Sequence, residues 1–194
     1  MRTFHWLLLI TASLFVGSAC MARQPASGLP AYTPTATVKD LMDSMVDPSA
    51  DVVWNSVATV ADANGIEDRT PRTNEEWANV RHGAIRLVEA TNLLLMPGRH
   101  VARPGEKSKT PGVELEPEQM EAMVNKDRAA WNTRAKALHD ASVAALQAID
   151  AKDAKRLFDV GEQIDTACEN CHRQYWYPNE KIPQSPSELG SRVR

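Results

Sequence analysis

The sequence predicts an all-α protein, folded as an antiparallel up-down-up-down bundle of four helices. Apolar residues recur at helical spacing along four stretches of the 194-residue chain, with no strand-like run and no internal repeat. Ala, Leu and Val are common while aromatic residues make up 6% of the chain, a composition that favours helices. Two of the stretches are joined by a very short link, which favours neighbouring antiparallel helices. An irregular all-α fold is the alternative.

The charge balance of the chain excludes one large class of partners. With 22 basic and 25 acidic residues the net charge is −3, so the sequence lacks the basic footprint of nucleic-acid binding. Neither a nucleophile–base set nor a substrate pocket can be identified, and we therefore predict no enzymatic activity.

Residues 1–19 are predicted to form a secretory signal peptide, which is removed. They have a basic start, an apolar run from Trp6 to Val16 and small residues after it, and the run is too short to span a bilayer permanently. The segment GSAC resembles the lipobox of bacterial lipoproteins, in which Cys20 would become the acylated N-terminus. Ordinary cleavage near Ala19 or Ala22 is the alternative. We expect a periplasmic protein by either route, attached to a membrane through Cys20 in the first case.

Flexible segments are predicted on both sides of the folded domain. Residues 20–36 are rich in Pro, Ser, Gly and Thr and cannot bury a core, so they form either a tether or a loose N-terminal tail. Residues 179–194 contain Pro183 and Pro186 and are predicted to form a flexible C-terminal tail. The folded domain is therefore expected over residues 37–178.

The first helix is predicted to end near Asn64-Gly65. Its stripe consists of apolar residues at helical spacing, namely Val38, Leu41, Met45, Val52, Val53, Val57 and Val60. Pro48 falls inside this helix, so we expect a kink or break there, or a new helical start capped at Ser49.

The second helix is predicted to begin at Thr73 or Asn74, either of which can cap it, and to stop at the segment MPGR. A charged, Pro- and Gly-rich surface loop follows. The third helix is predicted from Pro117 to Asp150, and the fourth follows almost at once and ends in the segment CENCH.

The segment CENCH contains the pattern C-x-x-C-H, formed by Cys168, Cys171 and His172. Positions i, i+3 and i+4 of a helix share one face, so both thiols and the imidazole can reach a single flat object against that face. Haem is such an object, because each thiol can add to one vinyl group while the imidazole binds the iron. The sequence thus predicts one covalent haem c near the C-terminal end of the fourth helix.

Other uses of the two cysteines fit this pattern less well. A redox-active C-x-x-C pair normally opens a helix after a strand, whereas this pair closes a helix, where a thiolate is not stabilised. A zinc site needs a further pair of ligands, which the sequence does not supply. A disulfide between positions i and i+3 of one helix is geometrically awkward.

Four helices with CENCH at the end of the last one resemble the class II c-type cytochromes, the cytochrome c′ group and its low-spin, methionine-ligated relatives. The resemblance covers about Thr37 to Pro178, and Arg173 and Tyr175 are similar to the residues that often follow the motif in that group. Pro48 and the long loop after Met96 depart from the pattern of the group. The resemblance implies a periplasmic electron carrier or gas-binding haem protein, and bundles of this group often form homodimers.

The sixth coordination position of the iron decides between these two functions. Met or His there gives a low-spin electron carrier, whereas an open position binds gases such as NO and CO. In the predicted bundle, five methionines fall at the haem end, namely Met42, Met45, Met96, Met120 and Met123. Met45 shares a helical face with Val38, Leu41 and Val52, and in the resemblance it takes the distal position. Met42, one turn earlier, is the second candidate.

Histidines other than His172 are weaker candidates for the distal position. His82 and His139 lie far along their helices from the haem end, while His100 lies in the loop at the correct end and is a minor candidate. Tyr175 and Trp176 directly follow the motif and either cover an edge of the haem or pack as ordinary aromatic residues.

The sequence therefore predicts an exported cytochrome that carries single electrons between redox donor and acceptor proteins, with His172 as proximal and Met45 as distal ligand. A gas-binding haem protein with an open distal site is one alternative. A haem enzyme, or a haem-bearing subunit of a larger redox complex, is another.

Overall fold

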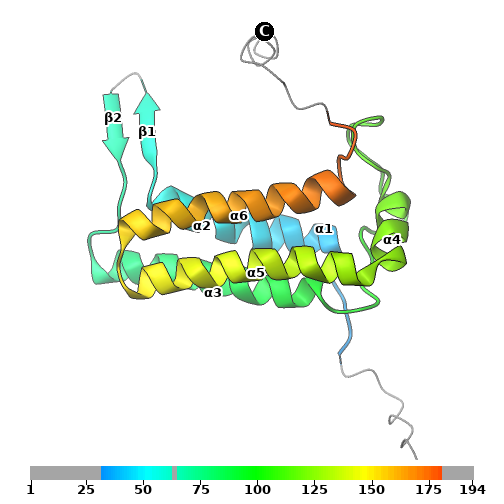
Figure 1. Ribbon diagram of the computed structural model, residues 1–194, viewed down its shortest axis with the longest axis horizontal. Helices are drawn as coiled ribbons and strands as arrows, with labels where there is room; N and C mark the ends of the chain where they lie inside the picture. Colours follow the sequence, from blue (N-terminus) through cyan, green and yellow to red (C-terminus); the bar gives the residue numbers. More distant parts are fainter. Residues whose placement is uncertain (1–31, 63–64, 181–194) are drawn as a thin grey trace, which may run out of the picture. The chain divides into compact units, whose positions relative to one another are not determined.

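The computed structural model of the protein describes residues 32–62 and 65–180. The predicted signal peptide, Cys20 and most of the two predicted flexible segments lie outside the described residues. The described chain is mostly helical, and its long helical segments alternate in direction in the order of the colours from blue to orange (Figure 1). None of the helices in these two ranges has the length and apolar character needed to cross a membrane.

The first helical segment consists of α1 (Val38–Leu41), the π-helical turn η1 (Met42–Val46) and α2 (Asp47–Ser56). Thr37 caps it in a capping box, in which the Thr37 hydroxyl accepts from the Asp40 amide and the Asp40 carboxylate accepts from the Thr37 amide, each at 3.0 Å. Pro48 neither breaks the helix nor creates a new start. It lies in the first turn of α2, and the wider turn η1 directly precedes it.

The first helix ends earlier than its apolar pattern predicts. Instead of continuing to Asn64-Gly65, the chain leaves the helix at Val57 and forms an antiparallel hairpin of β1 (Thr59–Asp62) and β2 (Gly65–Asp68). The pairing register runs from Thr59–Asp68 to Asp62–Gly65. The expectation of no strand was therefore wrong, because β-branched residues in this stretch favour extended backbone.

The second segment, α3 (Asn74–Leu94), begins where the sequence predicts. Thr73 is its N-cap and forms a capping box with Glu76. At Gly83, α3 lies close to α2, because an added Cβ atom would lie 2.7 Å from Cγ1 of Val52. A side chain at position 83 would collide with Val52, whereas the hydrogen of glycine does not. Gly83 therefore permits the tight packing of the two helices.

The predicted third helix is divided into α4 (Pro117–Lys126) and α5 (Arg128–Asp150). Asp127, with φ −137° and ψ 79°, interrupts the helix, and its carboxylate caps α5 by accepting from the amide of Ala130 at 2.9 Å. The prediction of one continuous helix was wrong because Asp stabilises a helix start through its side chain more than it stabilises a helix interior.

The last helix, α6 (Ala154–Tyr175), carries the C-x-x-C-H pattern and continues three residues beyond His172. It packs against α5, and α2 approaches it where the indole N–H of Trp54 donates to the carbonyl of Gly161 at 3.1 Å. The absence of a side chain at Gly161 allows this contact, since an added Cβ atom would lie 3.3 Å from the Trp54 ring.

The buried apolar side chains form two clusters along the bundle. The larger one lies among α2, α3, α5 and α6 and includes Leu87, Leu157 and Ile164. The smaller one lies where α6 ends and includes Leu41, Leu94, Val101, Val124, Trp131, Ala135 and Tyr175. Met42, Met45, Met120 and Met123 pack against this smaller cluster, as the predicted topology requires.

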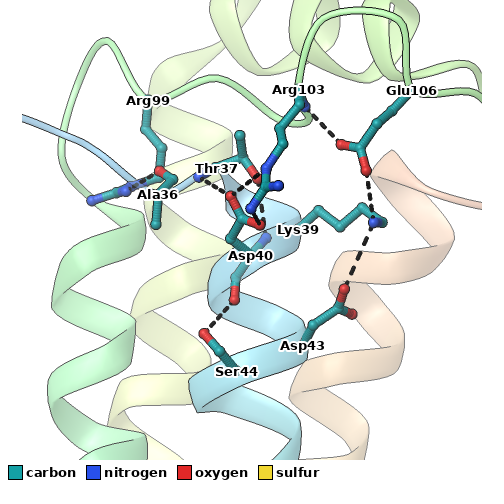
Figure 2. Close-up of polar contacts among 9 residues, drawn as sticks. All are labelled: Ala36, Thr37, Lys39, Asp40, Asp43, Ser44, Arg99, Arg103 and Glu106. Atoms are coloured by element: carbon teal, nitrogen blue, oxygen red, sulfur yellow. Dashed lines mark hydrogen bonds and ion pairs between the residues drawn. The ribbon is translucent and has the colours of Figure 1, made fainter.

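The loop between α3 and α4 clamps the start of α1 (Figure 2). The amides of Val38 and Lys39 donate to the carbonyls of His100 and Val101 at 2.9 and 3.0 Å. Ion pairs from Arg103 to Asp40 at 2.7 Å and from Lys39 to Glu106 at 2.9 Å join the same two segments.

Buried Arg99 adds to this clamp. Its guanidinium donates to the carbonyl of Leu93 at 3.0 Å and to that of Ala36. These bonds satisfy a carbonyl at the end of α3 and fix the segment that leads into α1. The position of α1 and η1 is therefore set by the loop as well as by helix packing.

Candidate haem-binding site

Cys168, Cys171 and His172 lie on one face of α6, at positions i, i+3 and i+4, and all three are half-buried. They line one cavity of about 20 Å³ toward the end of the bundle where α6 ends. Its other walls come from η1 and the start of α2, the end of α3, and α5, through Met42, Val46, Asp47, Leu94, Trp131, Arg134, Ala135 and Leu138. The lining is mostly apolar.

The two thiols are unpaired and neutral. Cys168 and Cys171 do not form a disulfide with each other. Burial, aided by the carboxylate of Asp47, raises the pKa of Cys168 from 9.0 to about 12. Burial also raises the pKa of Cys171 to about 11, although the guanidinium of Arg134 opposes the rise. A thiol with so high a pKa is a poor attacking group, which argues against a redox-active pair.

The imidazole of His172 is also kept neutral. Burial lowers its pKa, while the carboxylates of Glu169 and Asp47 act in the opposite direction. A neutral imidazole has the free nitrogen lone pair that an iron ligand needs. Within the described residues, no group of three or more His, Cys, Asp or Glu side chains is arranged to hold a metal ion by itself.

This set of side chains fits a covalently attached haem. Two neutral thiols and a neutral imidazole within one helical turn are the groups that form two thioethers and one axial bond, and an apolar cavity suits a porphyrin. A cavity of about 20 Å³ has room for about one water molecule. A porphyrin would therefore require η1 and α5 to lie farther from α6.

Met42 and Met45 differ in their relation to the cavity. Both are half-buried and pack against both apolar clusters, but Met42 lines the cavity and Met45 does not belong to its wall. A regular α-helix, on which the sequence argument for Met45 depended, would give a different register from the one that η1 produces. The structure thus brings the second candidate, Met42, to Cys168, Cys171 and His172.

The remaining predicted histidines lie outside the cavity wall. His82 is exposed on α3, and His139 on α5 lies 3.3 Å from the carboxylate of Asp140. His100 is exposed and its Nδ1 lies 2.8 Å from the carboxylate of Glu121.

Two charged residues of the cavity wall were not identified from the sequence. Asp47 follows directly after η1, and burial raises the pKa of its carboxyl while the nearby imidazole of His172 counteracts the rise. Arg134 on α5 donates to the amide oxygen of Gln174 at 2.7 Å. Its spacing of three residues from Trp131 and four from Leu138 puts it on the inward stripe of α5, which was the signal available.

No protein-family model matches the sequence, and no curated protein is significantly similar to it. Among solved structures, the fold is similar to a cytochrome c′ at 19% identity and a TM-score of 0.43, covering 73% of this chain and 98% of that chain. A nitric oxide complex of a mutant cytochrome c prime from Alcaligenes xylosoxidans is similar at 17% identity and a TM-score of 0.44. The match covers 76% of this chain and 99% of that chain.

The cytochrome c′ from Rhodobacter Spheriodes is likewise similar, at 17% identity and a TM-score of 0.43, with 74% of this chain and 91% of that chain covered. At such identities and TM-scores the likeness is weak. The chemistry of the cavity therefore rests on the residues of this chain.

Proposed function

We propose that this chain binds one haem c through thioethers at Cys168 and Cys171, with His172 as the proximal iron ligand, and that it carries single electrons. The observation that supports this most is the shared cavity, into which two neutral thiols and one neutral imidazole face from a single helical turn. A haem bound there supplies a one-electron iron couple.

The side chains around the cavity suit electron transfer. Val46, Leu94, Ala135 and Leu138 give the cavity an apolar wall, and an apolar surrounding influences the reduction potential of such a centre. We propose no catalysis, because the thiols and the imidazole of this cavity are the groups that the haem would take up.

We propose Met42 as the distal ligand in preference to Met45. Its support is that Met42 belongs to the wall of the cavity that Cys168, Cys171 and His172 line, and that the loop clamp holds α1, which leads directly into η1. Met45 is the second candidate, because it packs against the same two clusters.

A gas-binding protein is the second candidate function. The apolar wall around Met42 suits a small neutral molecule such as NO or CO if the methionine leaves the iron open. The spectrum of the ferric and ferrous protein separates the two functions, because a methionine ligand gives a low-spin form that binds CO slowly.

We further propose a periplasmic location, with attachment to a membrane through a lipid at Cys20, and redox donor and acceptor proteins as partners. The support is the N-terminal sequence and the need for export in bacterial covalent haem attachment. The oligomeric state of the purified protein tests whether it forms a homodimer. Proteins that co-purify with it test whether it belongs to a larger redox complex.

The decisive experiment is the intact mass of protein matured in a periplasm with the haem-attachment machinery. We expect the mass of one haem on the wild-type chain. Cys168→Ala and Cys171→Ala should each lose half of the attached haem or more, and the double variant should carry no attached haem. Wild-type protein without the added mass would reject the proposed function.

A further inference from the structure

The imidazole of His172 contacts two aromatic rings that lie four and five residues after it in the chain. The centroid of the Trp176 ring lies 5.1 Å from that of the imidazole, with an angle of 88° between the two planes. The centroid of the Tyr177 ring lies 5.7 Å from it, at an interplanar angle of 60°. These two rings also contact each other at 5.2 Å. His172 thus lines the cavity and also contacts an aromatic pair, Trp176 and Tyr177, that does not belong to the cavity wall.

The aromatic pair is fixed by its own backbone. The amides of Trp176 and Tyr177 both donate to the carbonyl of His172, at 2.7 and 3.0 Å. The hydroxyl of Tyr177 donates to the carboxylate of Glu169 at 2.7 Å. Since Glu169 lies one turn before His172 on α6, this bond holds the ring of Tyr177 beside the helix that carries the ligand.

The long loop between α3 and α4 holds the same segment from the other side. The amide of Leu115 donates to the carbonyl of Trp176 at 2.7 Å. Burial raises the pKa of the neighbouring Glu114, but its hydrogen bonds to the 108–110 turn and to Trp176 outweigh this effect and lower the pKa. The loop is therefore ordered by Glu114 and is attached to Trp176.

The turn that carries Glu114 is itself closely tied together. Its carboxylate accepts from the amides of Lys109 and Thr110 at 2.8 and 3.0 Å and from the hydroxyl of Ser108 at 3.0 Å. Gly112, with φ 90°, supplies the left-handed backbone that closes the turn. The loop residues 110–115 thus form a rigid support and not only a connection between helices.

We propose that Trp176 and Tyr177, supported by residues 110–115, are positioning residues for the iron ligand His172. They fix the rotation of the imidazole by edge-to-face packing and shield the ligand from replacement on the side away from the cavity. This inference rests on the proposed haem function and deepens it.

The physical basis is the preference of aromatic rings for perpendicular contact. An angle of 88° puts the edge of one ring against the face of the other, which is the favoured arrangement. Trp176 is 39% exposed, so its indole covers His172 while its outer side meets solvent. Rotation of the imidazole would break the contact with both rings.

The experiment uses matured haem protein and the variants Trp176→Ala, Trp176→Phe and Tyr177→Phe. The matched control is Phe158→Ala, an exposed aromatic residue on α6 about 21 Å from His172 along the helix at 1.5 Å per residue. The EPR g-values of the ferric protein report the orientation of the axial imidazole. Nitric oxide added to the ferrous protein tests whether His172 stays bound to the iron. Nitrosyl haem iron that has lost its histidine gives a three-line EPR signal.

We expect Trp176→Ala to change the g-values and to lose His172 about tenfold faster, which corresponds to an activation free energy lower by about 1.4 kcal/mol. Trp176→Phe should restore much of the wild-type behaviour, Tyr177→Phe should show a smaller change, and Phe158→Ala should match the wild type. If Trp176→Ala carries haem and shows the g-values and the rate of His172 loss of the wild type, the inference is overturned but the proposed function is not. A wild-type chain without haem would overturn the proposed function and the inference with it.

Discussion

The backbone amide of Asp47 donates its hydrogen bond to the carbonyl of Met42, five residues earlier. This bond defines the π-helical turn, which takes up more residues than an α-helical turn and changes which side chains face inward. Met42 and Asp47, the two ends of the turn, both line the cavity beside His172.

Replacement of Met42 tests the distal ligand. We expect Met42→Ala to convert the ferric haem protein from low spin to high spin and to remove the weak methionine-to-iron band, because the sulfur across the cavity is lost. Met45→Ala is the control, matched in residue type and in half-burial, and should retain the band. If the absorption spectrum shows that Met45→Ala loses the band and Met42→Ala keeps it, the distal ligand is Met45.

Gly83→Ala should destabilise the bundle. The added methyl would lie 2.7 and 2.9 Å from two carbons of Val52, a β-branched side chain that has little freedom to move. Overpacking costs typically 1–3 kcal/mol and outweighs the gain of about 1 kcal/mol from replacing a helical Gly. Gly161→Ala is the control, since its methyl would meet Trp54 only at 3.3 Å and should cost less. Equal melting temperatures for both variants would contradict this account of α2–α3 packing.

Asp40 should contribute to stability at neutral pH and lose that contribution in acid. The Thr37 amide first, and then Arg103 and the Thr37 hydroxyl, lower the pKa of Asp40 from 3.8 to about 2. A lowered pKa means stabilisation that is complete above 3.8 and is lost as the pH falls toward about 2. We expect Asp40→Asn to lower the melting temperature above this window, with the difference from wild type vanishing below it.

The control for Asp40 is Asp51→Asn, an exposed carboxylate of α2 outside the loop clamp. A constant difference between Asp40→Asn and wild type over the whole acid range would show that the loss is not linked to protonation. Added salt should reduce the Arg103 part of the effect, because that ion pair is exposed.

Arg99→Met should destabilise the end of the bundle that holds the loop. The substitution removes donors from the carbonyls of Leu93 and Ala36, and an unsatisfied buried polar group costs about 1–3 kcal/mol. Arg103→Met is the control, because an exposed ion pair contributes about 0.2–1 kcal/mol. Denaturant unfolding measures both, and a smaller loss at Arg99 than at Arg103 would refute the proposed capping role.

The two thiols should react slowly in the folded protein before haem is attached. Because burial raises the pKa of Cys168 to about 12 and that of Cys171 to about 11, few thiolates are present at neutral pH. In a Cys20→Ser chain, where only these two thiols remain, alkylation followed by mass spectrometry should be at least about tenfold slower than in urea. Equal rates in both conditions would mean that the thiols are not buried.

The parts of the fold that follow local rules could be predicted from the sequence. Thr73 with Glu76 three residues later marks a helix start, and the structure confirms it. The common face of Cys168, Cys171 and His172 follows from helical spacing alone and is found in α6. Both predictions depend only on residues within one turn of each other.

Where two local preferences compete, the local structure could not be predicted from the sequence. Asn64-Gly65 is a hairpin signal as well as a helix stop, and the valines before it suit a strand as well as an apolar stripe. Asp127 lies in a long periodic stretch but stabilises a new helix start. The inward position of Met42 depends on the hydrogen-bonding pattern of η1, which Pro48 suggests but does not determine.

The loop clamp has a mechanical consequence for the N-terminal end of the domain. Tension applied through the residues that precede Ala36 meets the Arg99 side chain first and then the backbone bonds of Val38 and Lys39 to the loop. The force is thereby shared with the 99–106 segment instead of unwinding α1 turn by turn. A pull on the chain ahead of Ala36 would thus load the 99–106 segment before it reaches Met42.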